Sequence, residues 1–292
     1  MLKRVAIYSK DSNDRTREAV QKLVSEFLKR DIEVNLYQKA GDTRFSFSRE
    51  EVTPFTSLAM LPARPDMILS VGGDGTFLET VLKVKDSGIP VAGVNTGRMG
   101  FLANIPNEEL GNSVDHLCSG DYQIIERSML EITSPPGLFN GESSTVLNEI
   151  TIQKLLLSMI IIHVYVDDVF LNTYWADGLI VSTATGSTAY NLSAGGPILS
   201  PGDESIIISP MSPHNLTIRP IVLSGSSRLR MVMEGRTEEC LLTCDFRFRK
   251  IPISEEIIIV KSKSRLGTVM LKGRDFYSTL RNRLMWGADT RN

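Results

Sequence analysis

The stretch DMILSVGGDGT, residues 66–76, decides the fold of the first part of this 292-residue chain. Its first half is short and apolar, as expected of a central parallel strand that helices cover on both faces. Glycines follow at once, and residues 76–87 then carry apolar side chains at helical spacing until Gly88 ends the pattern. A strand, a glycine turn and a helix form the repeating unit of α/β domains.

The same alternation extends on both sides of this stretch. Strands are expected at residues 4–9, 32–37 and 90–95, and a helix with one apolar face at residues 19–28, capped by Asn13 or Asp14. Residues 41–55 are polar and irregular, which indicates a loop. These patterns predict an α/β lobe with a doubly wound parallel sheet.

From residue 124 the sequence is typical of β-structure, because β-branched residues increase and turn residues recur at short intervals. Asp167 and Asp168 are expected to turn a hairpin, and residues 276–285 return to a helical pattern. Strands are expected at residues 145–153, 159–166, 179–182, 206–208, 221–223, 228–233, 239–243 and 257–261. We therefore predict an α/β lobe at 1–123, a mainly β lobe at 124–270, and a C-terminal helix at 271–292 that packs back on the first lobe.

Composition excludes several classes of function. A net charge of −2 and scattered Lys and Arg argue against a nucleic-acid partner. The longest apolar stretch, residues 155–166, contains polar residues and is too short to span a bilayer, so no membrane partner is expected. Three cysteines and three dispersed histidines give no metal-ligand spacing, so we assign no metal-ligating residue. The polar N-terminus indicates a cytoplasmic protein.

The glycine turn at residues 72–76 can bind phosphate. Glycine allows a sharp turn and a close approach to a ligand, and the amides of the following helix start favour an anion. A carboxylate there, Asp74, would be repelled by phosphate unless it accepts a proton or binds Mg²⁺, which are kinase roles. The alternative is a tight turn in which Asp74 only caps the helix. The turn matches neither the P-loop nor the dehydrogenase fingerprint.

Three further segments carry polar groups suited to a nucleotide. NTGRMGFL, residues 95–102, follows a parallel strand and should reach the same rim, where Arg98 can bind phosphate and Phe101 can wall a ring; a plain loop is the alternative. In Leu147-Asn148-Glu149, an amide suits adenine and a carboxylate suits ribose hydroxyls, although either can be a surface group. Residues 177–197 place several hydroxyl side chains in a turn, where they can form hydrogen bonds to a polar ligand. The alternative is that this turn is a plain loop.

Taken together and in this order, GGDGT, NTGRMGFLA, LNE and DGLIVSTATGSTAYNLSAGGPI resemble the NAD kinase family over residues 68–223. GGDG alone is shared with lipid kinases and phosphofructokinase-like enzymes, so the later blocks carry the specificity. The resemblance implies a transferase that moves the terminal phosphate of ATP, with Mg²⁺, to the 2′-hydroxyl of the adenosine ribose of NAD. It also implies a homodimer or homotetramer.

The resemblance further implies residue roles. Asp74 would be the catalytic carboxylate, and the other roles fall to substrate-binding residues. Phosphate contacts would be Gly73, Gly75 and Thr76; adenine contacts Asn148, Thr188 and Ala189; the ribose contact Glu149; the nicotinamide contact Asp177; and the pocket lining Thr185, Tyr190, Ser193, Arg98 and Phe101.

Two departures from the family pattern stand out. Ala184 replaces a frequent proline, and Asp245-Phe246-Arg247 replaces an Asp-Gly-Gln segment, where we carry over no role. Two alternatives remain open: a lipid kinase of the same superfamily, and a non-catalytic NAD(P) sensor. The first needs an apolar acceptor pocket, and the second would not need Asp74.

Overall fold

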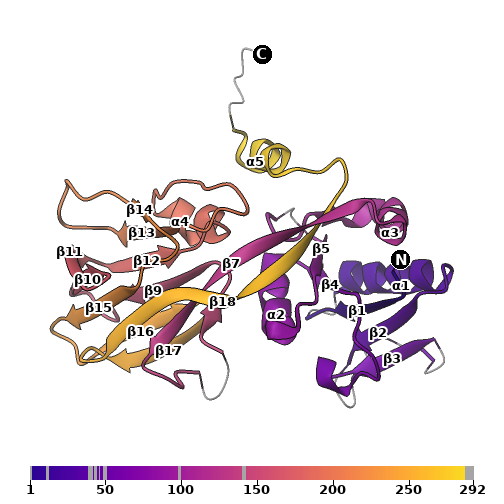
Figure 1. The fold of residues 1–292 in the computed structure, drawn as a ribbon, viewed down its shortest axis with the longest axis horizontal. Helices are drawn as coiled ribbons and strands as arrows, with labels where there is room; N and C mark the ends of the chain where they lie inside the picture. The colour runs from indigo at the N-terminus through magenta and orange to yellow at the C-terminus, as the bar shows by residue number, and fades with distance from the viewer. Residues whose placement is uncertain are drawn as a thin grey trace, which may run out of the picture. The chain divides into compact units, whose positions relative to one another are not determined.

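The computed structural model describes residues 2–10, 13–38, 42, 45, 47–48, 51–97, 100–139 and 143–286. Packing divides the chain into two compact units, residues 1–126 with 266–292 and residues 127–265. Strands β7 (Tyr122–Ser134) and β18 (Glu256–Leu271) pair with each other, and each belongs partly to both units (Figure 1). The boundaries expected from the sequence, 123/124 and 270/271, fall within these same two strands.

The first unit is built on a parallel sheet in the order β3-β2-β1-β4-β5-β18, with β6 beside β5. Its strands are β1 (Arg4–Tyr8), β2 (Glu33–Tyr37), β3 (Val52–Phe55), β4 (Met67–Gly72), β5 (Val91–Asn95) and β6 (Ile105–Pro106). From β1 the chain adds strands on one side and then crosses to the other side at β4. The carboxyl ends of β1 and β4 therefore form the switch point at which open α/β sheets bind ligands.

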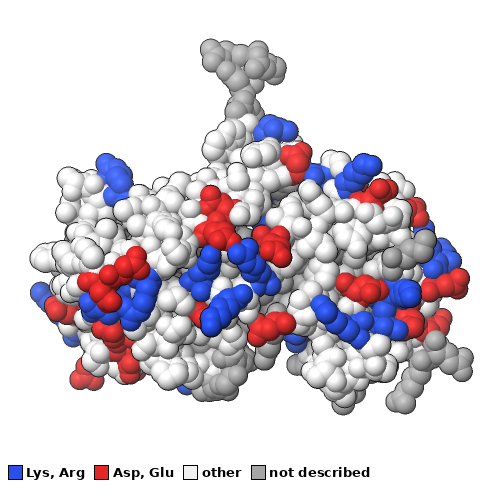
Figure 2. Space-filling view, viewed as in Figure 1, with Lys and Arg blue, Asp and Glu red and all other residues white. Residues whose placement is uncertain are grey.

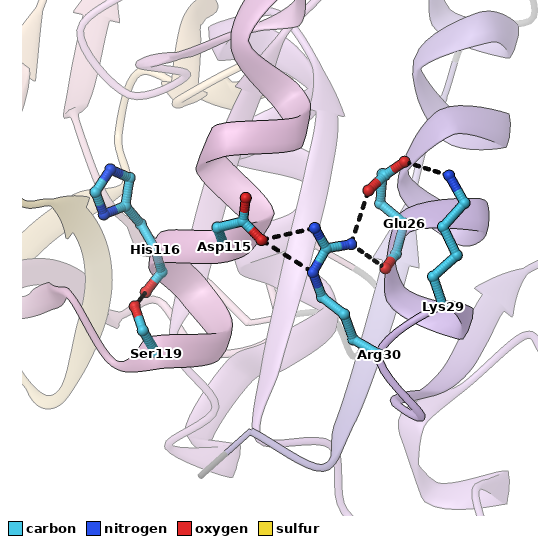
Figure 3. Close-up of polar contacts among 6 residues, drawn as sticks. All are labelled: Glu26, Lys29, Arg30, Asp115, His116 and Ser119. Atoms are coloured by element: carbon cyan, nitrogen blue, oxygen red, sulfur yellow. Dashed lines mark hydrogen bonds and ion pairs between the residues drawn. The ribbon is translucent and has the colours of Figure 1, made fainter.

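Among its described residues the first unit also contains the helices α1 (Asp14–Leu28), α2 (Asp74–Val84), α3 (Leu110–Ser119) and α5 (Phe276–Leu284). Of the two caps expected for α1, Asn13 and Asp14, the structure uses Asn13, whose Oδ1 accepts a hydrogen bond from the Thr16 amide at 2.9 Å. Arg30, just after α1, binds Glu26 and reaches Asp115 of α3 at 2.6 Å, which links the two helices (Figure 3). These groups are partly exposed, so the link adds little stability.

The second unit contains two antiparallel sheets, one in the order β11-β10-β15-β18 and the other in the order β14-β13-β12-β9-β16-β17. Apolar side chains from both sheets form one core. Besides β7 and β18, the elements are β8 (Thr145–Val146), β9 (Glu149–Gln153), β10 (Ile160–Val166), β11 (Val169–Ala176), β12 (Gly178–Ser182), α4 (Tyr190–Ser193), β13 (Ile206–Met211), β14 (Ile221–Leu223), β15 (Leu229–Glu234), β16 (Glu239–Cys244) and β17 (Arg247–Pro252).

The predicted fold class is confirmed, an α/β unit with a parallel sheet and a mainly antiparallel β unit. The predicted hairpin at Asp167 and Asp168 is also confirmed, since both residues have positive φ between β10 and β11. The loop expected at 41–55 is wrong for residues 52–55, which form β3. Strand β3 contains Pro54, which lacks a backbone N–H, but β3 lies at the edge of its sheet, where a missing N–H is tolerated.

Charged residues of both signs are intermixed on the face shown in Figure 2, without a large basic area. Among the described residues, no helix combines the length and the apolar character that crossing a membrane would require. Cys240 and Cys244 are free and buried in the second core, as expected of packing residues.

Candidate functional site

The glycine turn lies at the switch point of the parallel sheet. Strand β4 ends at Gly72, and α2 begins at Asp74. Gly73 and Gly75 are exposed, whereas Thr76 is buried. The first amides of a helix have no intrahelical partner, so this helix start presents N–H groups beside an exposed glycine backbone. The turn is therefore placed where an anionic ligand can be bound.

Asp74 does not simply cap its own helix, because its carboxylate binds a distant loop. Oδ2 accepts the Phe101 amide at 3.0 Å, and Oδ1 accepts the amides of Leu102 at 3.2 Å and Ala103 at 3.0 Å. A Cβ on Gly100 would collide with the Asp74 carboxylate, so only glycine permits this approach. Oδ2 accepts one of these bonds and keeps capacity for another donor.

The loop after β5 lies on the same edge of the sheet, as the sequence predicted. The Thr96 amide donates to the Gly72 carbonyl at 3.3 Å, which joins this loop to the glycine turn. The Phe101 ring packs near Phe276 of α5, with centroids 6.1 Å apart, and the Arg283 guanidinium lies 5.3 Å from its centroid. Arg98, the expected phosphate contact, lies outside the described residues.

In the second unit, Asn148 and Glu149 lie at the junction of β8 and β9. They contact the hydroxyl-rich turn that follows β12. The Asn148 carbonyl accepts the Thr183 amide at 2.9 Å, and the Leu147 carbonyl accepts Thr183 Oγ1 at 2.6 Å. The Glu149 carboxyl accepts a backbone hydrogen bond from Tyr190. The structure thus brings the Asn-Glu pair and the 183–190 turn together.

Glu149 is a buried carboxyl group whose pKa is raised. Burial raises its pKa to about 8, the nearby Asp245 carboxylate adds to the rise, and the Tyr190 amide opposes it. Within the described part of the chain, Glu149 Oε2 has no hydrogen-bond partner although it is buried. An orphaned buried oxygen is a group that a bound ligand can satisfy.

The other expected nucleoside residues fall into two places. Thr185 is buried in the 183–190 turn, Thr188 and Ala189 are half-buried there, and Tyr190 and Ser193 are exposed on α4. Asp177 precedes the opposite end of β12, where it pairs with Lys154 at 2.5 Å. At a rise of about 3.3 Å per residue, this puts Asp177 roughly 16 Å from the Ser182 end. The structure does not group it with Asn148 and Glu149.

Sequence reasoning missed three residues that hold this region. Asn191 is fully buried and bonds Ser187, Pro197 and Ser209 through its side-chain amide. Thr183 accepts the Gly186 amide in addition to its bonds to residues 147 and 148. Asp245 accepts three amides of residues 147–149. The only sequence signal was the departure noted at Asp245-Phe246-Arg247.

Within the residues that the structure describes, no group of three or more His, Cys, Asp or Glu side chains is arranged to hold a metal ion. Asp74 has carboxylate oxygens at the phosphate-directing turn, and such oxygens are suitable ligands for a Mg²⁺ that arrives with a nucleotide.

A carboxylate in a phosphate-directing glycine turn, in a chain that also carries polar groups suited to a nucleoside, is typical of a nucleotide-dependent kinase. Two family profiles, the ATP-NAD kinase N-terminal domain and the ATP-NAD kinase C-terminal domain, match residues 5–122 and 147–271. The chain belongs to the NAD kinase family.

Individual relatives agree with this assignment. An NAD kinase from Cytophaga hutchinsonii is 45% identical over 241 residues, 82% of each chain. A solved NAD kinase from Archaeoglobus fulgidus in complex with ATP is 25% identical, has a TM-score of 0.74, and is matched over 97% of this chain and 98% of that chain. A yeast NADH kinase complexed with NADH has a TM-score of 0.84 at 24% identity, over 99% of this chain and 89% of that chain, and shows the likeness of the fold.

Proposed function

We infer that this chain is an ATP-dependent NAD kinase that phosphorylates the 2′-hydroxyl of the adenosine ribose of NAD. A bond forms between the 2′-oxygen and the terminal phosphorus of ATP, and the bond from that phosphorus to the bridging oxygen breaks. The products are NADP and ADP, and the hydroxyl proton must be accepted by a base. Membership of the NAD kinase family, with a relative covered over 82% of its length, supports this reaction.

The observation that carries the proposal is Asp74 in its glycine turn at the switch point. Its Oδ2 keeps a site for the proton of the attacking hydroxyl, while the three loop amides fix the carboxylate in place. The backbone at Gly73, Gly75 and Thr76 is suited to phosphate contacts, because it opens a helix. Mg²⁺ enters with ATP and offsets the negative charge that would otherwise repel Asp74.

The second unit supplies groups that match a nucleoside. We assign Asn148, Thr188 and Ala189 to the adenine and Glu149 to a ribose hydroxyl, with Thr185, Tyr190 and Ser193 lining the pocket. The orphaned Glu149 Oε2 supports the ribose assignment, since a hydroxyl would satisfy it. Asp177 at the nicotinamide end, and Arg98 and Phe101 at the pocket border, stay as proposals.

The test is to incubate the protein with Mg-ATP and NAD and to measure NADP with an NADP-specific dehydrogenase. NADP formation that Asp74→Asn lowers at least about 100-fold is the expected result. Diacylglycerol and a sphingoid base serve as competing acceptors, because a lipid kinase of the same superfamily would phosphorylate them. Lipid phosphorylation without NADP would refute the proposal, and tight NAD binding without turnover would indicate an NAD(P) sensor instead.

We also propose a homodimer or homotetramer. Strand β11 lies at the edge of its sheet and exposes Val169, Phe170 and Trp175, and exposed apolar groups on an edge strand favour cover by another chain. Light scattering at micromolar concentration should give a mass of two or four chains of 32.4 kDa. A single-chain mass would contradict it. The cytoplasmic location expected from the sequence stays a prediction.

A further inference from the structure

The turn between β16 and β17 holds the segment that carries Asn148 and Glu149. Asp245 occupies this turn with a φ of 52° and is half-buried against the segment. Its Oδ2 accepts the Leu147 amide at 2.9 Å, and its Oδ1 accepts the amides of Asn148 at 2.9 Å and Glu149 at 3.1 Å. Its own amide donates to the Glu149 carbonyl at 3.0 Å.

Arg247, two residues later, holds the preceding part of the same segment by its carbonyl groups. Its guanidinium donates to the Ser143 carbonyl and to the Thr145 carbonyl, the latter at 2.9 Å. Asp245 thus binds backbone N–H groups, and Arg247 binds backbone carbonyl groups, of the same stretch of chain, residues 143–149. This gives Asp245-Phe246-Arg247 a structural role that the sequence left open.

The opposite side of the segment is also fixed, so the bend has little freedom. The Asn148 carbonyl accepts the Thr183 amide, and a Cβ on Gly186 would collide with that carbonyl. The bend separates β8 from β9, and in a regular strand Asn148 and Glu149 would simply alternate across the sheet. The orientation of both side chains therefore depends on the hydrogen bonds that shape the bend.

We propose that Asp245, assisted by Arg247, is a positioning residue for NAD binding: it fixes the 147–149 bend and so presents Asn148 and Glu149 to the nucleoside. The proposal rests on the proposed NAD kinase function. Asp245 need not touch the substrate, because its effect on binding comes through the bend that its two oxygens hold. Its loss is expected to weaken NAD binding while the phosphate-transfer groups at Asp74 stay intact.

The test compares Asp245→Asn with Asp167→Asn. Asp167 is a matched control, because it is also a turn aspartate with positive φ, here 50°, that accepts a backbone amide, from Arg228 at 2.9 Å. Asp245→Asn replaces one of the two accepting oxygens by an NH₂ group, which cannot accept a hydrogen bond from a backbone amide. One or more hydrogen bonds of about 1 kcal/mol each are therefore lost. We expect the NAD KM and Kd to rise about tenfold and the ATP KM to change less than about twofold.

Hydrogen exchange gives a readout that does not depend on activity. The amides of residues 147–149 should exchange at least about tenfold faster in Asp245→Asn and stay protected in Asp167→Asn. A folded Asp245→Asn with unchanged NAD Kd, or with unchanged exchange at 147–149, would overturn the proposal. Should that variant not fold, Arg247→Gln decides: a raised NAD Kd with faster exchange supports the proposal, and no change in either overturns it.

Direct NAD titration calorimetry separates this inference from the proposed function. A wild type that binds NAD but makes no NADP would refute the kinase function, while the Kd comparison would still decide the role of Asp245. A wild type that binds no NAD would overturn both.

Discussion

Replacing Glu149 by a glutamine should change how stability depends on pH. The folded-state pKa of Glu149 is raised to about 8, mainly by burial, whereas the unfolded chain releases this proton at the ordinary pKa of a glutamate. Between those two pH values the folded state holds one proton more than the unfolded state. Rising pH therefore lowers the free energy of unfolding of the wild type in this window.

The magnitude follows from linkage. One extra bound proton gives a slope of about 1.4 kcal/mol per pH unit, so this group alone costs about 3 kcal/mol between pH 5.5 and 7.5. The side chain that Glu149→Gln introduces is nearly isosteric with the protonated acid and does not titrate. The variant should therefore exceed the wild type by about 1 kcal/mol at pH 5.5 and by about 4 kcal/mol at pH 7.5.

Urea unfolding of both proteins without ligand, at pH 5.5, 6.5 and 7.5, measures this difference. Glu26→Gln is the control, because Lys29 and then Arg30 lower the pKa of Glu26 to about 2, so its titration lies outside the window. Its stability should run parallel to that of the wild type. A constant difference between Glu149→Gln and the wild type over the three pH values would refute the reasoning.

Three further substitutions test the site. Asp74→Asn should lower kcat at least about 100-fold with little change in NAD Kd, and should loosen the loop amides it now accepts; retention of a third of the activity would leave only a capping role. Asn148→Ala should raise the NAD KM about tenfold, and an unchanged KM with a collapsed kcat would place Asn148 in the chemistry. Gly100→Ala should lower kcat at least about tenfold, because its Cβ meets the Asp74 carboxylate, whereas Gly97→Ala meets nothing within 4 Å and should be neutral; equal activity of the two would contradict this.

The sequence predicted those parts of the fold that depend on local periodicity. Helix α1 shows this best, because its buried face contains Ala19, Val20, Leu23, Val24 and Phe27, all within the stretch 19–28 that was expected to carry an apolar face. Helix α3 was overlooked, although Leu110, Val114 and Leu117 are buried at helical spacing. Its glycine, asparagine and serine residues have weak helix propensity, so packing on the core outweighs the local signal.

The sequence predicted those residues of the candidate site whose role follows from their immediate neighbours in the chain. Asp74 stood out because a carboxylate within phosphate-directing glycines is unusual. Its bonds to the loop at 101–103 span 27 to 29 residues, and those of Asp245 span 96 to 98 residues. Such pairings depend on which strands become neighbours. No local pattern around Asp245 could have indicated the amides that it accepts.

The paired strands β7 and β18 make the second unit an insertion within the first. The α/β unit receives β18 beside β5, through the register of Thr268 with Val91, only from the last part of the chain. During synthesis, the edge of β5 that pairs with β18 therefore stays unpaired until the ribosome has made the whole inserted unit. A truncated chain of residues 1–126 would expose this edge and tend to aggregate. Since residues 126 and 266 lie on paired strands, a short linker that replaces residues 127–265 offers a route to an isolated α/β unit.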